Sequence, residues 1–527
     1  MNFLDFILTN KFEILEQTIE HIGLALTSLL ISILIGIPLG IIITRLKKIK
    51  DFVIGFVGII QTIPSIALLG FLIPFFGIGV IPAILALFLY ALLPIVRSTC
   101  VGIEEVDSSV KEAANGMGMS DIQMLRKVEL PLAVPVIFSG VRTAAVLNVA
   151  IATLCAYIAA GGLGEFIFRG IALSNKNMIL AGAIPAALLA ISFDFILGIL
   201  QKYINKIIKP MLIVSCVVLF IIVPFVVAPQ LFHHTFQAGF TAEFIEREDG
   251  YQGLKKVYNF SNLLKVKELE SGLIFEALKS KQVNVISGHS TDGRIKAYHF
   301  QILKDDKHLF PPYYACPIIK GQTLRKYPAL RNIFSRIQGK LTNEKMAQLN
   351  YRAEHNQELP ENVARDFLLE AGLLPAKKNV MASLKPVQAE IIIGCKNFTE
   401  QFILAEIFKL LIENNTNLTV DLKKGLAGTT ICFDALKKGE IDLYPEYTGT
   451  ALFVILKPDK KLQDSLIEDK NKVYSYVKNE CKKRFDIEWL PHLGFNNTWV
   501  LVMRGRDAEK LMIRTISDLK DDINRKT

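Results

Sequence analysis

Two stretches of this chain repeat one arrangement of a helical segment, an apolar strand and a polar strand end. The first is GLIFEALKSKQVNVISGHSTDG at 272–293, and the second is TTICFDALKKGEIDLYPEYTG at 429–449. In an open α/β sheet, ligands usually bind at the carboxyl ends of the strands. Two such units therefore predict a domain with two lobes and a ligand site between them.

Catalytic and metal chemistry have little support in the sequence. The seven Cys are scattered without a CxxC pair or metal-ligand spacing, so we expect no metal site, disulfide framework or cofactor. His289 in SGHSTDG is the one tempting catalytic residue, but a lone His is more often structural. No Walker motif is present, so any ATP hydrolysis must come from another polypeptide. The residues favour a binding protein over an enzyme.

The composition predicts a membrane part and a water-soluble part. The chain has 527 residues, 51% hydrophobic, with a net charge of +10 and a mean hydropathy of +0.36. It is too apolar for one soluble body and long enough for at least two domains. The net positive charge would allow nucleic-acid binding, but the sequence contains no known nucleic-acid-binding motif. The N-terminal MNFLDFILTNKFEILEQ lacks the features of a cleavable signal peptide.

Apolar runs long enough to cross a bilayer fill the first 232 positions. The uncharged run Phe52–Val96 is long enough to cross twice, with a break near Pro74, Gly77 and Gly79. We expect six spans in all: Gly23–Ile43, two within Phe52–Val96, Leu132–Ala160, Asn177–Leu200 and Pro210–Phe232. Arg142 and Asp194 fall at membrane depth, where ionisable residues indicate a transport pathway or a buried pair. Arg142 could also extend to the interface.

The distribution of Lys and Arg predicts the orientation, because short cytoplasmic loops are enriched in them. The clusters after the first, third and fifth spans fall on one side: Arg45, Lys47, Lys48, Lys50, Arg97, Lys111, Arg126, Lys127, Lys202, Lys206 and Lys209. The other side has Lys11, Arg169 and Lys176. The N-terminus is therefore expected to face outward. Six crossings of the cytoplasmic (inner) membrane would leave everything after Phe232 on its extracytoplasmic side.

The polar loop at 97–132 is expected to form two short helices joined at Gly116 to Ser120. It resembles the EAA motif of ABC importer permeases at Glu112, Ala113, Ala114, Gly118, Leu130 and Pro131, with Val128 where Ile is usual. The segments QTIPSIALLG, LLPIVRST and GGLGEFIFRGI resemble the betaine and choline branch of that family. This resemblance implies that the loop docks on a cytoplasmic ABC ATPase subunit, and that the permease is a homodimer in membrane lipid. An ordinary amphipathic loop helix is the alternative.

The second half resembles the binding proteins for glycine betaine, carnitine and choline. The resemblance rests on IIIGCKNFTEQFILAEI, YPEYTGTAL, LGFNNTWVLVMR, FTAEFIEREDGYQGLKK, STDGRIKAY and DDKHLFPPYYACP. In that family, the segment similar to 390–520 comes first and the segment similar to 238–372 comes second. The order is reversed here, which indicates a circular permutation with a new joining segment at 373–390.

The expected fold is an all-α membrane permease fused to an α/β two-lobed, periplasmic-binding-protein-like domain. We place the permease at 1–232 and the extracytoplasmic binding domain at 233–527, with 233–380 as the second half of the family order and 388–527 as the first. If the domain is permuted, strands from 238–293 and 494–504 must share one lobe, and 301–492 must form most of the other.

The resemblance also implies a ligand site. A quaternary ammonium cannot donate a hydrogen bond, so the family surrounds it with aromatic rings, which here correspond to Tyr444, Tyr447, Tyr313 and Tyr314. Polar ligand contacts correspond to Asn397, Thr399, Gln401, Asn497, Thr498, Glu243, Ser290, Thr291, Asp292 and Arg294. Arg294 is expected to bind a carboxylate through two hydrogen bonds, with an ion pair to Asp292 as the alternative. Neighbours in a strand point to opposite faces, so one of Tyr313 and Tyr314 is expected to be structural.

The ligand is expected to be a trimethylammonium betaine. The fused architecture also resembles ergothioneine transporters, which slightly favours ergothioneine over glycine betaine, choline or carnitine. A membrane protein that senses such a ligand without transporting it is an alternative, but a sensor would not need the docking loop.

Overall fold

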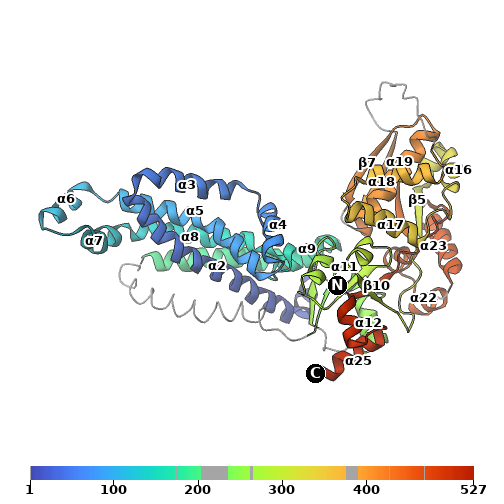
Figure 1. Cartoon of the computed structure of the whole chain (residues 1–527), viewed down its shortest axis with the longest axis horizontal. Coiled ribbons are helices and arrows are strands. Elements are labelled where there is room, and N and C mark those ends of the chain that lie inside the picture. Colours follow the sequence, from blue (N-terminus) through green and yellow to red (C-terminus); the bar gives the residue numbers. More distant parts are fainter. Residues whose placement is uncertain are drawn as a thin grey trace. The chain divides into compact units, whose positions relative to one another are not determined.

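The computed structural model describes residues 2–173, 175–202, 236–260, 265–374, 390–426, 428–467 and 469–526. The chain divides into two compact units. Unit 1 comprises Met1–Ile171 and Asn175–Thr235, and unit 2 comprises Ala172–Ser174 and Phe236–Thr527. Figure 1 shows that the first is helical and that the second contains both sheets.

Unit 1 consists of helices joined by short turns. They are α1 (Phe3–Thr9), α2 (Lys11–Arg45), α3 (Lys47–Thr62), α4 (Ser65–Phe76), α5 (Val80–Glu104), α6 (Ser108–Gly116), α7 (Asp121–Met124), α8 (Leu130–Cys155), α9 (Gly164–Ala172) and a helix at Lys176–Lys202, with a π-helical turn at Leu125–Glu129 and a 3-10 turn at Ala156–Ile158.

Four described helices are long and apolar enough to cross a membrane, or five if one bent pair counts as a span. The bent pair, Lys48–Thr62 and Ser65–Phe76, changes direction by 98°. Ile63 is extended there because a following proline disfavours the helical conformation. The run Phe52–Val96 is thus broken at Pro64 as well as at the expected Gly77–Gly79. The last expected span, Pro210–Phe232, lies outside the described residues, so the count of six stays a prediction.

Small residues let the long helices of unit 1 approach closely. A Cβ on Gly40 of α2 would lie 2.6 Å from the Cβ of Thr99 on α5. A Cβ on Gly140 of α8 would likewise lie 2.5 Å from the Cβ of Ser98.

The two charges at membrane depth pair with each other, since Nε and Nη2 of Arg142 each donate to a carboxylate oxygen of Asp194 at 2.5 Å.

Unit 2 contains two five-stranded sheets with the same topology. The first has the order β2-β1-β3-β10-β4 and the second β7-β6-β8-β5-β9. Their strands are β1 (Gln237–Phe240), β2 (Lys265–Glu268), β3 (Val285–His289), β4 (Phe300–Leu303), β5 (Ala315–Lys320), β6 (Ile391–Lys396), β7 (Val420–Leu426), β8 (Leu443–Tyr447), β9 (Ile487–Trp489) and β10 (Trp499–Arg504). We call the part built on the first sheet lobe 1 and the part built on the second lobe 2.

Each sheet receives its fourth strand from a distant part of the chain. In lobe 1, β10 is antiparallel to β3 and pairs Trp499 with His289. In lobe 2, β5 is antiparallel to β8 and pairs Ile318 with Tyr444. The chain therefore passes between the lobes through 304–314 and again through 490–498. This confirms that strands from 238–293 and 494–504 share a lobe. Of the segment 301–492, β4 and the residues directly after it belong to lobe 1, since Lys304 bridges to Thr515 and the carboxylates of Asp305 and Asp306 accept hydrogen bonds from Tyr258 and Ser517.

Helices cover both sheets. They are α11 (Ala242–Glu246), α12 (Tyr251–Val257), α13 (Ile274–Lys279), α14 (Gly293–Ala297), α15 (Gly321–Lys326), α16 (Ala329–Ser335), α17 (Asn343–Glu354), α18 (Pro360–Glu370), α19 (Thr399–Asn415), α20 (Thr429–Lys438), α21 (Thr448–Thr450), α22 (Lys460–Leu466), α23 (Lys470–Phe485), α24 (Gly505–Leu511) and α25 (Ile516–Lys526), with a π-helical turn at Ala451–Leu456.

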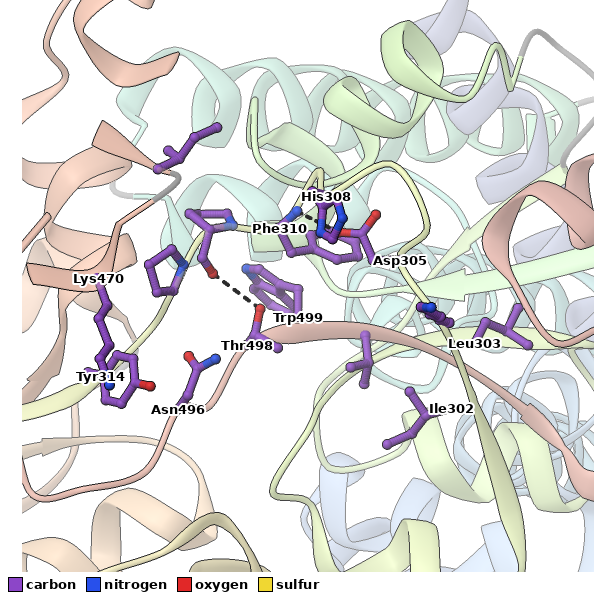
Figure 2. A pocket seen from close by; sticks show the side chains of 15 residues that line it. Ile302, Leu303, Asp305, His308, Phe310, Tyr314, Lys470, Asn496, Thr498 and Trp499 are labelled. Atoms are coloured by element: carbon purple, nitrogen blue, oxygen red, sulfur yellow. Dashed lines mark hydrogen bonds between the residues drawn. The ribbon is translucent and has the colours of Figure 1, made fainter. Parts of the chain in front are cut away.

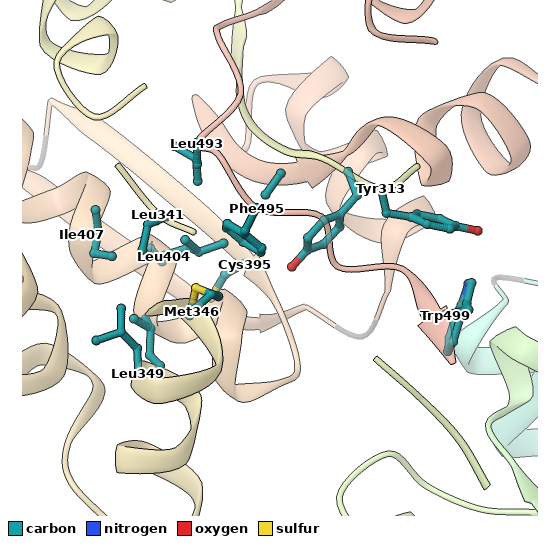
Figure 3. Close-up of a cluster of buried hydrophobic side chains, with 14 of the residues drawn as sticks. Tyr313, Leu341, Met346, Leu349, Cys395, Leu404, Ile407, Leu493, Phe495 and Trp499 are labelled. Atoms are coloured by element: carbon teal, nitrogen blue, oxygen red, sulfur yellow. The ribbon is translucent and has the colours of Figure 1, made fainter. Parts of the chain in front are cut away.

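The main core of unit 2 lies around α19. Phe408 of this helix packs edge-on against Phe334 of α16, with 5.0 Å between the ring centroids. Figure 3 shows Ile407 and Leu349 at one end of the cluster and Trp499 at the other. The six Cys that the structure describes are buried and unbridged, so they act as small apolar residues.

The shared sheets make the two halves of unit 2 dependent on each other. Polypeptides 233–380 and 388–527 should each fold poorly alone, because one lacks β10 and the other lacks β5. Mixed together, they should form a stable complex, which circular dichroism and co-purification would detect. Joining 388–527 ahead of 233–380 should preserve the fold, since the same strands then pair. Two independently stable fragments without affinity for each other would contradict this.

Candidate functional site

The carboxyl ends of strands from both lobes and the two crossover segments meet in one region. Strand β3 of lobe 1 ends at His289, and strands β6 and β8 of lobe 2 end at Lys396 and Tyr447. Ligands of open α/β sheets bind at such strand ends. We call this region the interlobe site.

A buried carboxylate, Glu400 of α19, lies at its centre. Its Oε1 accepts hydrogen bonds from the Tyr447 hydroxyl at 2.6 Å and from Nδ2 of Asn497 at 2.8 Å. Its Oε2 lies 2.6 Å from the Thr291 hydroxyl and accepts from Nδ2 of Asn350 at 3.0 Å. These four partners are all uncharged. Burial raises the pKa of Glu400, although the hydrogen bonds oppose this shift.

These bonds join the lobes, because Thr291 belongs to lobe 1 whereas Glu400 and Asn350 belong to lobe 2. Nδ2 of Asn350 also donates to the carbonyl of Thr291 at 2.8 Å. Beside them, α14 lies so close to α17 that a Cβ on Gly293 would be 2.2 Å from the backbone nitrogen of Tyr351. The described conformation therefore has the two lobes closed on each other.

Arg294, the expected carboxylate partner, already has carboxylates beside it. Its Nη2 donates to Oδ2 of Asp292 at 2.8 Å, and its Nε lies 3.6 Å from Oε2 of Glu354 on α17. Burial, together with the nearby Asp292, raises the pKa of Glu354 to about 8. A ligand carboxylate at Arg294 would have to share or displace these partners, so its role in binding stays a prediction.

The tyrosines of β8 lie on opposite faces of the strand. Tyr444 is fully buried in the lobe 2 core, and its hydroxyl donates to Oε2 of Glu446 at 2.9 Å. The other oxygen of Glu446 accepts from Nζ of Lys396 at 2.6 Å, and this ammonium lies 5.1 Å from the centre of the Tyr447 ring. Tyr447 thus belongs to the interlobe site, whereas Tyr444 packs behind it.

The tyrosines of the first crossover also point in opposite directions. The buried Tyr313 hydroxyl donates to Asp249, and Nη2 of Arg247 donates to that hydroxyl at 3.2 Å. Tyr314 instead faces a pocket of about 490 Å³, where Lys470 lies 5.1 Å from its ring centre. Figure 2 shows Tyr314, Lys470 and Asn496 together at one end of this pocket and Ile302 at the other. This geometry agrees with the expectation that the side chains of Tyr313 and Tyr314 point to opposite sides.

The remaining expected ligand residues differ in their surroundings. Gln401 is buried, donates to the Pro445 carbonyl at 2.9 Å and receives a hydrogen bond from the Lys396 backbone at 3.2 Å. Ser290 and Thr498 donate to the backbone carbonyls of Asn496 and Pro311. The structure leaves Asn397 exposed and Thr399 and Glu243 half-buried.

Sequence reasoning missed several residues at this site. Glu400 and Lys396 lie within the KNFTEQ segment whose Asn, Thr and Gln were chosen, and Trp499 directly follows Thr498. Helical spacing could have identified Glu400, because it precedes Gln401 at the buried start of α19. Trp499 carried no such signal, because its aromatic ring is equally typical of a core.

Comparison with known proteins accounts for both units. The family model for the substrate binding domain of the ABC-type glycine betaine transport system matches residues 228–370 and 389–526, which is more than half of the chain. The model for the inner membrane component of binding-protein-dependent transport systems matches residues 36–210. The chain belongs to the ABC-type glycine betaine transport family. It is an importer permease fused to its substrate-binding domain, and a permease of this family works with an ABC ATPase subunit in the inner membrane.

Individual relatives resemble the permease part. The carnitine transport permease protein of Listeria monocytogenes is 47% identical over 192 residues, which cover 36% of this chain and 88% of that protein. The choline transport system permease protein of Bacillus subtilis (strain 168) is 43% identical over 201 residues, which cover 38% and 93%. These relatives are transporters, not enzymes. Among solved structures, a glycine betaine/carnitine/choline ABC transporter shares 34% identity over 26% of this chain and 52% of its own, with a TM-score of 0.22.

The loop of the permease that resembles the EAA motif forms α6 and α7. Glu112 and Ala113 are exposed, whereas Ala114 is buried against the permease. Gly118 has a φ of +73°, so it makes the turn that a residue with a side chain would strain. Leu130 and Pro131 begin α8. Met117 and Ile122 are 70% and 69% exposed, which provides apolar surface for a partner.

Glu400→Gln should destabilise unit 2 by about 1–3 kcal/mol, because the new NH2 group must face the NH2 group of either Asn350 or Asn497, and two donors cannot bond to each other. Both Trp residues of the chain lie in unit 2, so thermal unfolding of the full chain followed by Trp fluorescence reports on this unit alone. Glu413→Gln makes the same change on the same helix outside the cluster and should have little effect. Equal unfolding midpoints for Glu400→Gln and the parent would contradict this role.

Proposed function

We propose that the chain imports a trimethylammonium osmoprotectant of the glycine betaine, carnitine and choline class, using ATP hydrolysed by its partner subunit. The supporting observation is an interlobe site rich in aromatic rings on the same chain as a permease. Relatives named for carnitine and choline transport point the same way. These relatives give no support to ergothioneine as the ligand. We therefore propose glycine betaine, choline or carnitine as the ligand.

The proposed site comprises Tyr447, Asn497, Thr291 and Gln401, which lie around Glu400. Tyr313 and Tyr314 come from the adjacent crossover, and Tyr444 lies behind Tyr447. We propose that these three rings complete the aromatic surroundings of the ligand. The permease is proposed to be a homodimer whose binding domains face the extracytoplasmic side, as the Lys and Arg distribution indicates. In such a dimer the halves of unit 2 could also exchange between chains; the strand pairing described here closes within one chain.

Uptake by proteoliposomes that contain the chain and its ATPase tests this function. We expect saturable, ATP-dependent uptake of labelled choline, carnitine or glycine betaine, and weaker competition by ergothioneine. Gly118→Trp should abolish uptake but not ligand binding, because it strains the docking turn of unit 1 and leaves the binding residues of unit 2 unchanged. Ligand binding without uptake by the parent would favour a sensor, and uptake of ergothioneine alone would restore the earlier preference.

Labelling with a membrane-impermeant maleimide tests the orientation. Met512 of unit 2 is 81% exposed and Met117 of the docking loop is 70% exposed, so Cys at either site is accessible to a reagent on its own side. In intact cells stripped of any outer barrier, Met512→Cys should react at once. Met117→Cys should react only after the membrane is permeabilised. The reverse pattern would place the binding domain in the cytoplasm.

A further inference from the structure

Four aromatic rings form a row across the interlobe site. The His289 ring stacks on Trp499, with 4.2 Å between the ring centroids. On its other side, His289 lies 6.0 Å from Phe398, and Phe398 lies 6.5 Å from Tyr447. Trp499 and His289 belong to lobe 1, while Phe398 and Tyr447 belong to lobe 2. Closure of the lobes therefore brings the middle two rings together.

Protein cations already face the two ends of this row. The guanidinium carbon of Arg247 lies 5.8 Å from the Trp499 ring centre, and Nζ of Lys396 lies 5.1 Å from that of Tyr447. Among the residues that the structure describes, no Lys or Arg lies over the Phe398 ring. Since an aromatic face attracts a cation, the ring of Phe398 is the one left for a ligand ammonium.

His289 provides a hydrogen-bond acceptor next to that ring. Its Nδ1 is buried and has no hydrogen-bond partner among the described residues. Burial lowers the pKa of His289 to about 4, and a hydrogen bond with the Asn497 backbone only partly opposes this, so the ring is neutral at physiological pH. A neutral imidazole carries its proton on one ring nitrogen and accepts a hydrogen bond on the other, and we assign the acceptor role to the unpartnered Nδ1. Buried acceptors normally have a donor.

We propose that Nδ1 of His289 accepts a hydrogen bond from a ligand hydroxyl while the trimethylammonium group lies on the Phe398 ring. This inference rests on the proposed import function and narrows its substrate class. Choline and carnitine carry a hydroxyl two carbons from the ammonium nitrogen, so one molecule can reach both neighbouring groups. Glycine betaine has no hydrogen-bond donor. The site therefore selects hydroxylated quaternary amines over those without a hydroxyl.

Matched ligand pairs test this selection, by isothermal titration calorimetry on the full chain in detergent. Choline is compared with propyltrimethylammonium, and L-carnitine with γ-butyrobetaine, because each second ligand lacks only the hydroxyl donor. The parent should bind the hydroxylated member about 3- to 10-fold more tightly, as one net hydrogen bond requires. His289→Phe keeps a ring but removes the acceptor, so it should abolish the preference by weakening the hydroxylated ligand alone.

Three further variants separate the contribution of the hydroxyl contact to binding from that of the ammonium contact. His289→Gln retains an acceptor and should keep part of the preference, which distinguishes loss of the acceptor from misfolding. Phe398→Leu should weaken both members of a pair by the same factor, about 2- to 30-fold, and leave the preference intact. His492→Phe is the matched control, because Nδ1 of His492 also lacks a partner among the described residues but its ring packs on Tyr314 instead. It should leave the preference for the hydroxylated ligand unchanged.

The outcomes separate this inference from the proposed function. Equal affinities within each pair for the parent, or an unchanged preference in His289→Phe, would overturn the inference and leave quaternary amine import standing. If the parent binds no quaternary amine of either pair, the proposed function fails and the inference fails with it.

Discussion

The fold of unit 2 depends on two strands that arrive from distant parts of the chain. Strand β10 completes the sheet that begins at β1, and β5 completes the sheet that contains β6 and β8. An incomplete sheet exposes unpaired backbone groups and the apolar side chains that should cover them. Lobe 1 is therefore not finished until both ends of the domain have been made, and lobe 2 needs β5 from the half of the domain that precedes its other strands. The crossover segments that carry these strands also supply Tyr313 and Asn497, so the same constraint assembles the site.

The interlobe site pairs its buried cations with carboxylates and surrounds its central carboxylate, Glu400, with uncharged donors. Arg247 is bound by Asp249, and Lys396 is bound by Glu446, so each buried cation has its own carboxylate. A buried charge without a partner would be strongly unfavourable. Glu400 is different, since uncharged donors surround it and burial raises its pKa. A quaternary ammonium ligand would enter a region where the strong charges are already matched, and ring faces would supply its attraction.

Much of the architecture could be predicted from the sequence. Apolar runs and the polar loop indicated a helical membrane part, and the two echoing stretches became the corresponding helix and strand pairs α13–β3 and α20–β8. The reversed order of the binding-domain segments predicted the shared sheet of β3 and β10. The second break in Phe52–Val96, at Pro64, was missed, because the number of apolar residues in a run does not show where a proline ends a helix.

The site could be predicted only in part, because motif residues were chosen by type and not by direction. Tyr444 and Tyr447 belong to one motif, but they are three positions apart on the strand, which places their rings on opposite faces. Arg294 was expected to bind a carboxylate, with an ion pair to Asp292 as the alternative, and Asp292 does lie against its guanidinium. Glu400 was not predicted, although its neighbours Thr399 and Gln401 were. Its function in joining the lobes depends on Thr291 and Asn350, which are distant in sequence.

The fusion of unit 1 to unit 2 in one polypeptide also affects transport kinetics. A separate binding protein meets its permease by diffusion, so its encounter rate depends on its abundance. A domain fused to its permease is instead held at a fixed effective local concentration. Each permease then carries one receptor of its own, and excess free receptor cannot compete for the docking surface. The import rate is thereby determined by external ligand and by ATP, independent of how much binding protein the cell makes.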